Sequence, residues 1–155
     1  MFEELFSLEN STFRGTDLGD PMTLVKQNEA AVASRHNRSG VPRHDDRLGL
    51  AFEYVLNDSL QLFVEYYPKN PSQQSDSNRV AAIVANLSLN DEVEIAQLYN
   101  EIEQYFTRKY RISSGTYGNY SWKTSTPKTQ SMEVGLRMSD SKKGITVMFI
   151  DTQTP

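Results

Sequence analysis

The stretch that decides the fold of this chain is NDEVEIAQLYNEIEQYFTRKYR, residues 90–111. Acidic residues crowd its first turn and basic residues its last, which suits the positive and negative ends of a helix dipole. The apolar side chains recur with the i, i+3, i+4 and i+7 spacing of a helix that has one buried stripe. That stripe comprises Ile95, Leu98, Tyr99, Ile102, Phe106 and Tyr110. The stretch therefore predicts an amphipathic helix that must pack on an apolar surface.

Three strands are predicted before this helix. Residues 48–69 are rich in β-branched and aromatic residues that alternate with period two around a break at 57–59, and 79–89 alternates again. A three-residue loop at 57–59 keeps apolar side chains opposite one another, whereas a two-residue loop mixes the faces. The predicted pairs are Leu56 with Leu60, Tyr54 with Leu62, Phe52 with Val64 and Leu50 with Tyr66.

Three more strands are predicted after the helix. They cover residues 117–124, 131–138 and 144–151, with a loop at 125–130 and a hairpin connection at 139–143. The hairpin register places apolar residues in opposite pairs: Met138 with Ile145, Leu136 with Val147 and Val134 with Phe149.

A second, shorter helix is predicted at residues 21–34. Asp20 is suited to the N-cap, and Pro21 to the first helical position, where its missing amide costs nothing. One face of this helix carries Met22, Val25, Glu29 and either Val32 or Ala33. This apolar stripe is thin.

Together these elements predict a single α+β domain, residues 1–155, with an antiparallel sheet of about six strands packed by two main helices in the order α-βββ-α-βββ. Residues 1–12 form either a short docking helix or a frayed end, and residues 68–78 a mobile, turn-rich loop. One strand, 131–138, is expected at a sheet edge.

Composition bounds the function. With 16 basic and 20 acidic residues the net charge is −4, which disfavours general attraction to nucleic acid. The chain has no Cys, so it forms no disulfide, and no segment approaches the about 20 apolar residues of a membrane span. We expect the cytoplasm if Met1 is native, and the periplasm or cell envelope if a leader was removed. Oligomeric state stays open.

A resemblance appears at FRGTDLGDPMTLVKQNE, residues 13–29. It resembles the opening of a family of bacterial domains without an assigned role, many of them in secreted or lipoprotein-like chains. The matching positions are Phe13, Arg14, Gly19, Val25, Lys26 and Glu29. The helix ending in RKY, a strand with Trp122 and the closing hairpin resemble the same family. Its fold is similar to envelope domains of the outer-membrane assembly and β-lactamase-inhibitor types, which implies an extracytoplasmic, unassigned role.

The densest basic segment lies at residues 35–47. Arg forks there suit phosphate or carboxylate, so we name a ligand or partner site. Its residues are Arg35, Arg38, Arg43, His44 and Arg47, to which we add Trp122 from the second half. Solvated loop charge is the competing interpretation. His36, His44, Asp45 and Asp46 are types that bind metals, but no helical His pair supports a metal site.

No nucleophile, base and oxyanion donor come together in the sequence, so we predict no catalytic residue, no metal and no cofactor. The predicted function is a non-catalytic interaction domain. Its partner would be another protein or a peptide, bound at an exposed sheet face or at the edge strand 131–138. The alternative is a small-ligand pocket or weak hydrolase between the helix at 90–111 and the sheet, lined by Tyr99, Tyr105 and Trp122.

Overall fold

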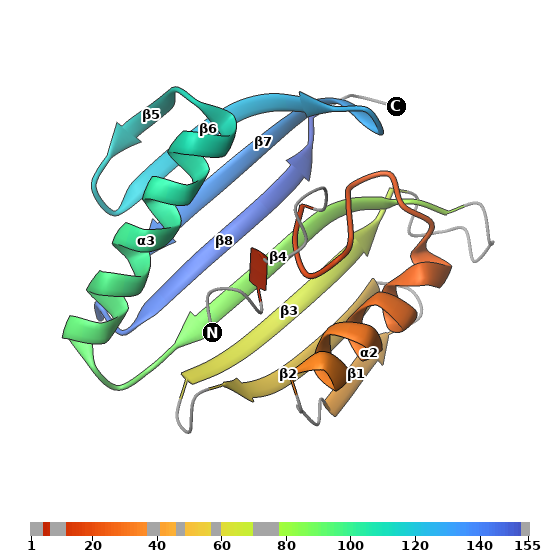
Figure 1. Ribbon diagram of the computed structural model, residues 1–155, viewed down its shortest axis with the longest axis horizontal. Helices are drawn as coiled ribbons and strands as arrows, with labels where there is room; N and C mark the ends of the chain where they lie inside the picture. The colour runs from red at the N-terminus through yellow and green to blue at the C-terminus, as the bar shows by residue number, and fades with distance from the viewer. Residues whose placement is uncertain are drawn as a thin grey trace.

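A computed structural model describes residues 5–6, 12–36, 49–56, 60–69 and 78–152, and the backbone of 41–45. The described part of the chain is α+β, with the helices α2 and α3 on one side of a single antiparallel sheet (Figure 1). The helical elements are η1 (Met22–Leu24), α2 (Val25–Arg35) and α3 (Glu92–Tyr110). The strands are β1 (Val41–Asp45), β2 (Gly49–Leu56), β3 (Leu60–Pro68), β4 (Val80–Ser88), β5 (Ser113–Thr116), β6 (Asn119–Thr126), β7 (Thr129–Met138) and β8 (Gly144–Asp151).

The sheet is built from two similar halves. Its order is β1-β2-β3-β4-β8-β7-β6-β5, so the last strand of each half lies at the centre and β1 and β5 form the edges. Each half is one helix followed by four strands, where the sequence predicted three. The two added strands are short: β1 includes Pro42 and charged residues, and β5 is SSGT, and neither alternates apolar with polar residues.

The predicted registers of both hairpins are confirmed. In the first, Leu56 pairs with Leu60 and Leu50 with Tyr66, and in the second, Met138 pairs with Ile145. The expected edge position of 131–138 is wrong, because β7 lies between β6 and β8. The predicted loop at 125–130 is shorter than expected, a turn at residues 127–128, since β6 reaches Thr126 and β7 starts at Thr129.

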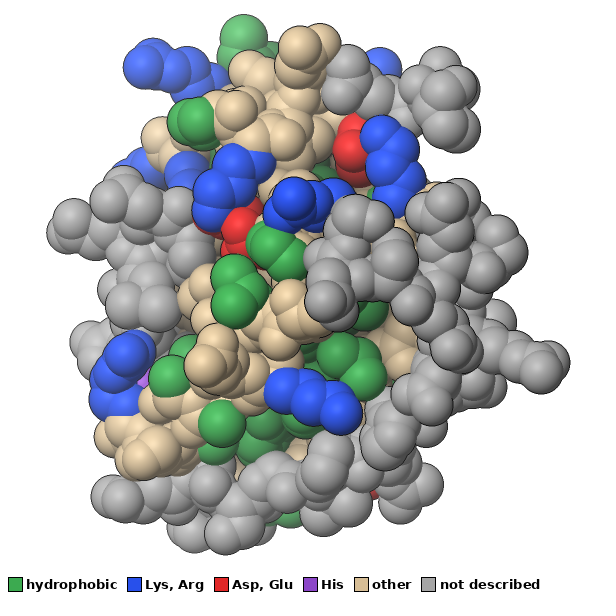
Figure 2. Space-filling model, turned by 90° about the vertical axis from the view of Figure 1, so that its right-hand side faces the viewer, with side chains coloured by type: hydrophobic (Ala, Val, Ile, Leu, Met, Phe, Trp, Pro, Cys, Tyr) green, Lys and Arg blue, Asp and Glu red, His purple; other side chains and the backbone are tan. Residues whose placement is uncertain are grey.

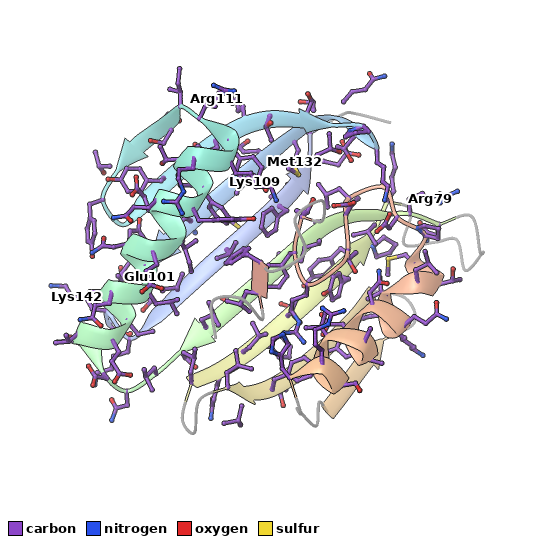
Figure 3. The ribbon with its side chains drawn as sticks, viewed as in Figure 1. Arg79, Glu101, Lys109, Arg111, Met132 and Lys142 are labelled. Carbon is purple, nitrogen blue, oxygen red and sulfur yellow. The ribbon has the colours of Figure 1, made fainter. Side chains whose placement is uncertain are left out.

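Helix α3 matches its prediction closely. Its six buried side chains are the six predicted, Ile95, Leu98, Tyr99, Ile102, Phe106 and Tyr110. The side chain of Asp91 caps the helix by accepting from the amides of Val93 at 3.0 Å and Glu94 at 3.1 Å. In Figure 3, Glu101 lies on this helix, and Lys109 and Arg111 lie towards its C-terminal end.

The start of the first helix differs from its prediction. Residues Met22–Leu24 form a 3-10 turn, and α2 begins at Val25. Asp20 does not cap it; its carboxylate accepts from the Asp17 amide at 2.9 Å and from Lys128 Nζ at 2.7 Å. Asp20 therefore ties this segment to the β6–β7 turn.

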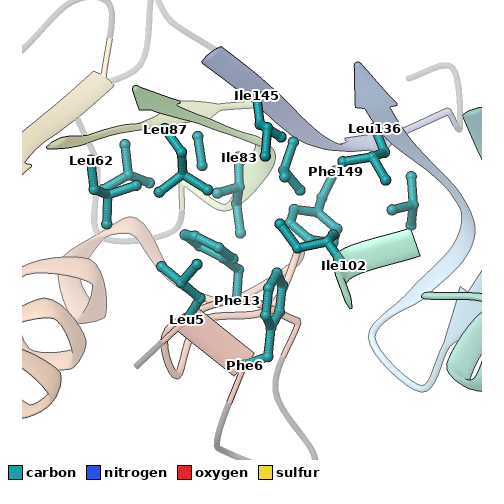
Figure 4. Packing of buried hydrophobic residues seen from close by; sticks show 14 of the residues in the cluster. Leu5, Phe6, Phe13, Leu62, Ile83, Leu87, Ile102, Leu136, Ile145 and Phe149 are labelled. Atoms are coloured by element: carbon teal, nitrogen blue, oxygen red, sulfur yellow. The ribbon is translucent and has the colours of Figure 1, made fainter. Parts of the chain in front are cut away.

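The N-terminal residues that the structure describes lie in the core. Leu5 and Phe13 are fully buried and Phe6 nearly so, and the Phe6 ring meets that of Phe106 at 5.5 Å. Figure 4 shows the side chains of Leu5, Phe6 and Phe13 among those of the central strands and α3, such as Phe149 on β8 and Ile102 on α3. Most of the predicted loop at 68–78 lies outside the described residues.

Candidate functional site

The first cluster with reactive chemistry lies under α2. The Arg14 guanidinium donates from Nε to both carboxylate oxygens of Glu29, at 3.1 and 3.0 Å, and its Nη2 lies 3.0 Å from Oε2. Tyr54 donates to Oε2 at 2.6 Å, and Tyr66 donates to Oε1. Arg14 also stacks over the Tyr54 ring, 4.5 Å from its centroid. One carboxylate thus joins the N-terminal segment, α2, β2 and β3.

This buried network is closed to solvent. Arg14 is 2% exposed, Glu29 1%, and the two tyrosines no more than 5%. Burial and the Glu29 carboxylate both raise the pKa of Tyr54 and of Tyr66. Burial alone would lower the pKa of Arg14, but Glu29 and the two hydroxyls outweigh it and raise the pKa. Because a carboxylate that a substrate cannot reach does no chemistry on it, the network is structural.

The space between α3 and the sheet is filled by aromatic side chains. The Phe106 ring meets the rings of Trp122 at 5.3 Å and Phe149 at 5.8 Å. Tyr99 is fully buried, and its hydroxyl accepts from the Gly118 amide at 2.8 Å. Burial is the main cause that raises the pKa of Tyr99 to about 12. These contacts are those of a packed core.

The accessible surface is the other side of the sheet. Strand residues that alternate with the buried ones point away from both helices, and no helix among the described residues lies on them. We call this surface the outer face. Its central residues are Glu53, Gln61, Phe63, Glu65, Tyr67, Ala82, Val84, Asn86, Arg137, Met148 and Ile150.

The outer face is part apolar and part polar. Phe63, Val84 and Met148 are half-buried by their neighbours, whereas Ile150 is exposed. Near them the Tyr67 hydroxyl donates to Glu65 at 2.6 Å, and this hydrogen bond is the largest cause that raises the pKa of Tyr67 to about 12. Apolar side chains framed by hydrogen-bonding groups are typical of protein-binding surfaces.

A hollow of about 280 Å³ lies at one end of the outer face. Strands β2, β3 and β4 line it through residues that include Glu53, Val55, Gln61, Phe63, Asn86 and Ser88. Its volume falls just below the roughly 300–1,000 Å³ of pockets that enclose a small molecule. It is large enough for a side chain of a partner. Two acids of this face, Glu53 and Glu65, are not directly opposite each other, because Glu53 pairs with Phe63 and Glu65 with Ala51.

The residues of the predicted basic site are placed as follows. Arg35 is exposed near the end of α2, and β1 carries Arg43 opposite Ala51 and His44 opposite Leu50. Arg38 and Arg47 lie outside the described residues. The segment taken for a loop is thus partly an edge strand, and its role in anion binding stays a prediction.

The sixth predicted site residue, Trp122, is 1% exposed and packs against Phe106. We therefore do not include Trp122 in a binding site.

Figure 2 views the side of the molecule on the right of Figure 1. The Lys and Arg side chains it shows are spread among other types rather than gathered in one patch.

Sequence reasoning placed Glu29 on the buried face of its helix but did not name its partners. An acid on an apolar stripe was the available signal, because a buried carboxylate needs a cation or donors. Arg14 was noted only as one of the positions at which residues 13–29 resemble a bacterial domain family.

Among the described residues, no group of three or more His, Cys, Asp and Glu could hold a metal ion. None of the described helices combines the length and the apolar character needed to cross a membrane. No family model, curated protein or solved structure matches this chain. The resemblance of residues 13–29 to a bacterial domain family accordingly stays a prediction.

Proposed function

We propose that this chain is a non-catalytic interaction domain that binds another protein through its outer face. The observation that carries the proposal is the contrast between the two sides of one sheet. On the helix side, Glu29 is buried and hydrogen-bonded to Arg14 and to two tyrosines. On the outer face, Phe63, Val84 and Met148 stay partly accessible beside hydrogen-bonding side chains. A domain built this way offers a contact surface rather than a reaction site.

Neither sheet edge is as suitable as this face for a partner strand. Edge strand β5 has only four residues, and Gly115 within it has a φ of +102°, which departs from extended strand geometry. A Cβ at Gly115 would meet the Asn119 carbonyl oxygen at 2.2 Å. Edge strand β1 has five residues and includes Pro42, which has no amide hydrogen to donate.

Affinity capture tests this proposal. The immobilised chain is incubated with an extract of its native host, and the captured proteins are compared with those held by Gln61→Arg plus Asn86→Arg. Both residues are exposed on the outer face, so the fold tolerates the change while the face gains charge and bulk. The control is Gln97→Arg plus Asn100→Arg on the exposed side of α3.

We expect at least about tenfold weaker capture by the outer-face variant and unchanged capture by the control. Equal capture by both variants would rule the outer face out. Arg38→Glu plus Arg43→Glu tests the basic segment as a secondary anion contact. Unchanged capture would remove that segment from the site.

A second candidate function is the binding of a small ligand, and one observation favours it. A hollow of about 400 Å³ lies at the N-terminal end of α3, within the usual size range of ligand sites. It is lined by residues that include Glu92, Ala96, Tyr117, Met138 and Lys142. None of the three predicted lining residues, Tyr99, Tyr105 and Trp122, is among them. Ala96→Phe would fill this hollow, so it should leave capture unchanged under the main proposal.

A further inference from the structure

The outer face carries a charge pattern that is opposite on its two sides. On the β2–β3 side the outward acids are Glu53 and Glu65. On the β6–β7 side the outward charges are Lys123, Glu133 and Arg137, a net single positive charge among the described residues. Lys123 and Glu133 are register partners, which leaves Arg137 as the unopposed charge of that side.

Between these sides runs an apolar strip. Central strands β4 and β8 contribute the adjacent pairs Val84 with Met148 and Ala82 with Ile150. Phe63 extends the strip onto β3. An apolar centre between flanks of opposite charge fits a partner with the same pattern reversed.

A second copy of this chain has that reversed pattern. We propose that two copies associate outer face to outer face about a two-fold axis parallel to the strands and lying between β4 and β8. The inference rests on the proposed function, because it takes the outer face as a protein-binding surface, and it names the partner. A two-fold contact of this kind uses the same patch on both copies.

The strand order and register decide which residues meet. The rotation places β4 of one copy over β8 of the other, and β3 over β7. Along the shared rows, Val84 faces Met148 of the second copy, and Ala82 faces Ile150. The centre of the contact is therefore apolar on both sides.

The flanks are complementary in the same arrangement. The row through Phe63, Asn86 and Thr146 includes Arg137 on β7, so the Phe63 ring faces a guanidinium of the second copy. Glu65 faces Gly135, beside which the Met148 methyl lies (3.1 Å from the position of a Gly135 Cβ), and is one row from the same Arg137. Glu133, the acid on the otherwise basic side, shares a row with Tyr67, whose hydroxyl proton is already donated to Glu65, so this pair adds no attraction.

The available area is sufficient for such a contact. Eight strands about 4.8 Å apart, which average about eight residues in length at about 3.3 Å per residue, give a face of roughly 900 Å². A specific interface of standard size buries about 800 Å² on each partner. Two sheets packed face to face lie about 10 Å apart, which side chains of this size fill.

Sedimentation velocity on the purified full chain tests the proposal. We expect wild type to be a dimer that dissociates on dilution, and Val84→Glu to raise the dissociation constant at least about tenfold. Val93→Glu is the matched control, because Val93 is 66% exposed on α3, away from the outer face. It should leave the dimer unchanged, and circular dichroism should show both variants folded.

Charge reversal tests the orientation. Glu65→Lys and Arg137→Glu should each weaken the dimer about tenfold, and the double variant should recover most of the loss. A wild-type chain that stays monomeric up to about 1 mM would overturn self-association. A dimer without recovery in the double variant would overturn this arrangement. Neither result touches the proposed function, because capture that depends on Gln61 and Asn86 would still identify the outer face as a surface for a different protein.

Discussion

The helix over strands β1–β4 and the helix over strands β5–β8 occupy equivalent places in the sheet, yet they bury different chemistry. Helix α3 buries six side chains, all of them aliphatic or aromatic. Helix α2 buries only four, and one of these is charged. It is Glu29, whose carboxylate is bound by Arg14 and two tyrosines. One helix is fixed by apolar packing and the other by a buried ion pair, so the halves should respond differently to substitution.

The largest effect is expected at Glu29. Glu29→Ala leaves the Arg14 charge and two tyrosine hydroxyls buried without their acceptor, so we expect the free energy of unfolding to fall by about 4–5 kcal/mol. Urea denaturation gives this difference. The control Glu101→Ala removes an exposed carboxylate from α3 and should cost less than about 0.5 kcal/mol. A loss at Glu29 no larger than at Glu101 would mean that the network does not hold α2.

The α3 half should lose stability through cavities instead. Phe106→Ala or Ile102→Ala removes a fully buried side chain, which we expect to cost roughly 2–5 kcal/mol. The same denaturant midpoints measure it. Because no charge is uncovered, Phe106→Leu should restore much of the loss, whereas no apolar residue at position 29 should do so while Arg14 remains. A full-size loss in Phe106→Leu would contradict packing as the cause.

Buried tyrosines in both halves, among them Tyr99 and Tyr66, have raised pKa values, so alkaline pH should destabilise the whole domain, and a Tyr66 variant isolates the share of the α2 network. Tyr66 has an ordinary pKa of 10.0 when unfolded and a raised pKa when folded, so the native state keeps a proton that the unfolded state loses. Stability is therefore complete below about pH 10 and falls as pH rises above it. Tyr66→Phe should cost about 1–2 kcal/mol at neutral pH and show a shallower alkaline decline.

Denaturation midpoints measured from pH 8 to 12 check this expectation, with exposed Tyr117→Phe as the control. An identical alkaline decline in Tyr66→Phe and wild type would show that Tyr66 does not contribute to it.

The smallest effects belong to exposed charges. Lys128 lies 2.7 Å from Asp20 and 3.2 Å from Asp17, but its side chain is 52% exposed. We expect Lys128→Ala to cost less than about 1 kcal/mol, and Lys69→Ala, at another exposed position, no more than about 0.5 kcal/mol. Thermal midpoints would suffice to rank them. If Lys128→Ala matched Phe106→Ala, the tie between the N-terminal segment and the β6–β7 turn would be a main support of the fold.

The same contrast explains what the sequence could predict. The α3 half follows from apolar periodicity, because every buried position is hydrophobic and the pattern alone specifies it. Both hairpin registers follow for the same reason. Strands β1 and β5 could not be found this way, since they lie at the edges, where pairing with one neighbour rather than burial holds them.

The candidate site was only partly accessible to sequence reasoning. An exposed sheet face was expected, but its composition depends on strands β3, β4, β8 and β7 lying side by side. Sequence order places α3 and three strands, β5, β6 and β7, between β4 and β8. Similarly, Arg14 and Glu29 are fifteen residues apart, and only the path of the N-terminal segment beneath α2 brings them together.

The proposed function depends most on the pairing of Arg14 with Glu29. Because these two charges bind each other in the core, neither is available to a ligand on the helix side, and the outer face is the accessible surface. A double-mutant cycle with Arg14→Met and Glu29→Leu measures that pairing directly. We expect each single variant to lose several kcal/mol and the double variant to be about 2–3 kcal/mol more stable than the sum of the two losses implies. Strictly additive losses would contradict the account, since two residues that do not interact in the folded state would leave both charges free for another role.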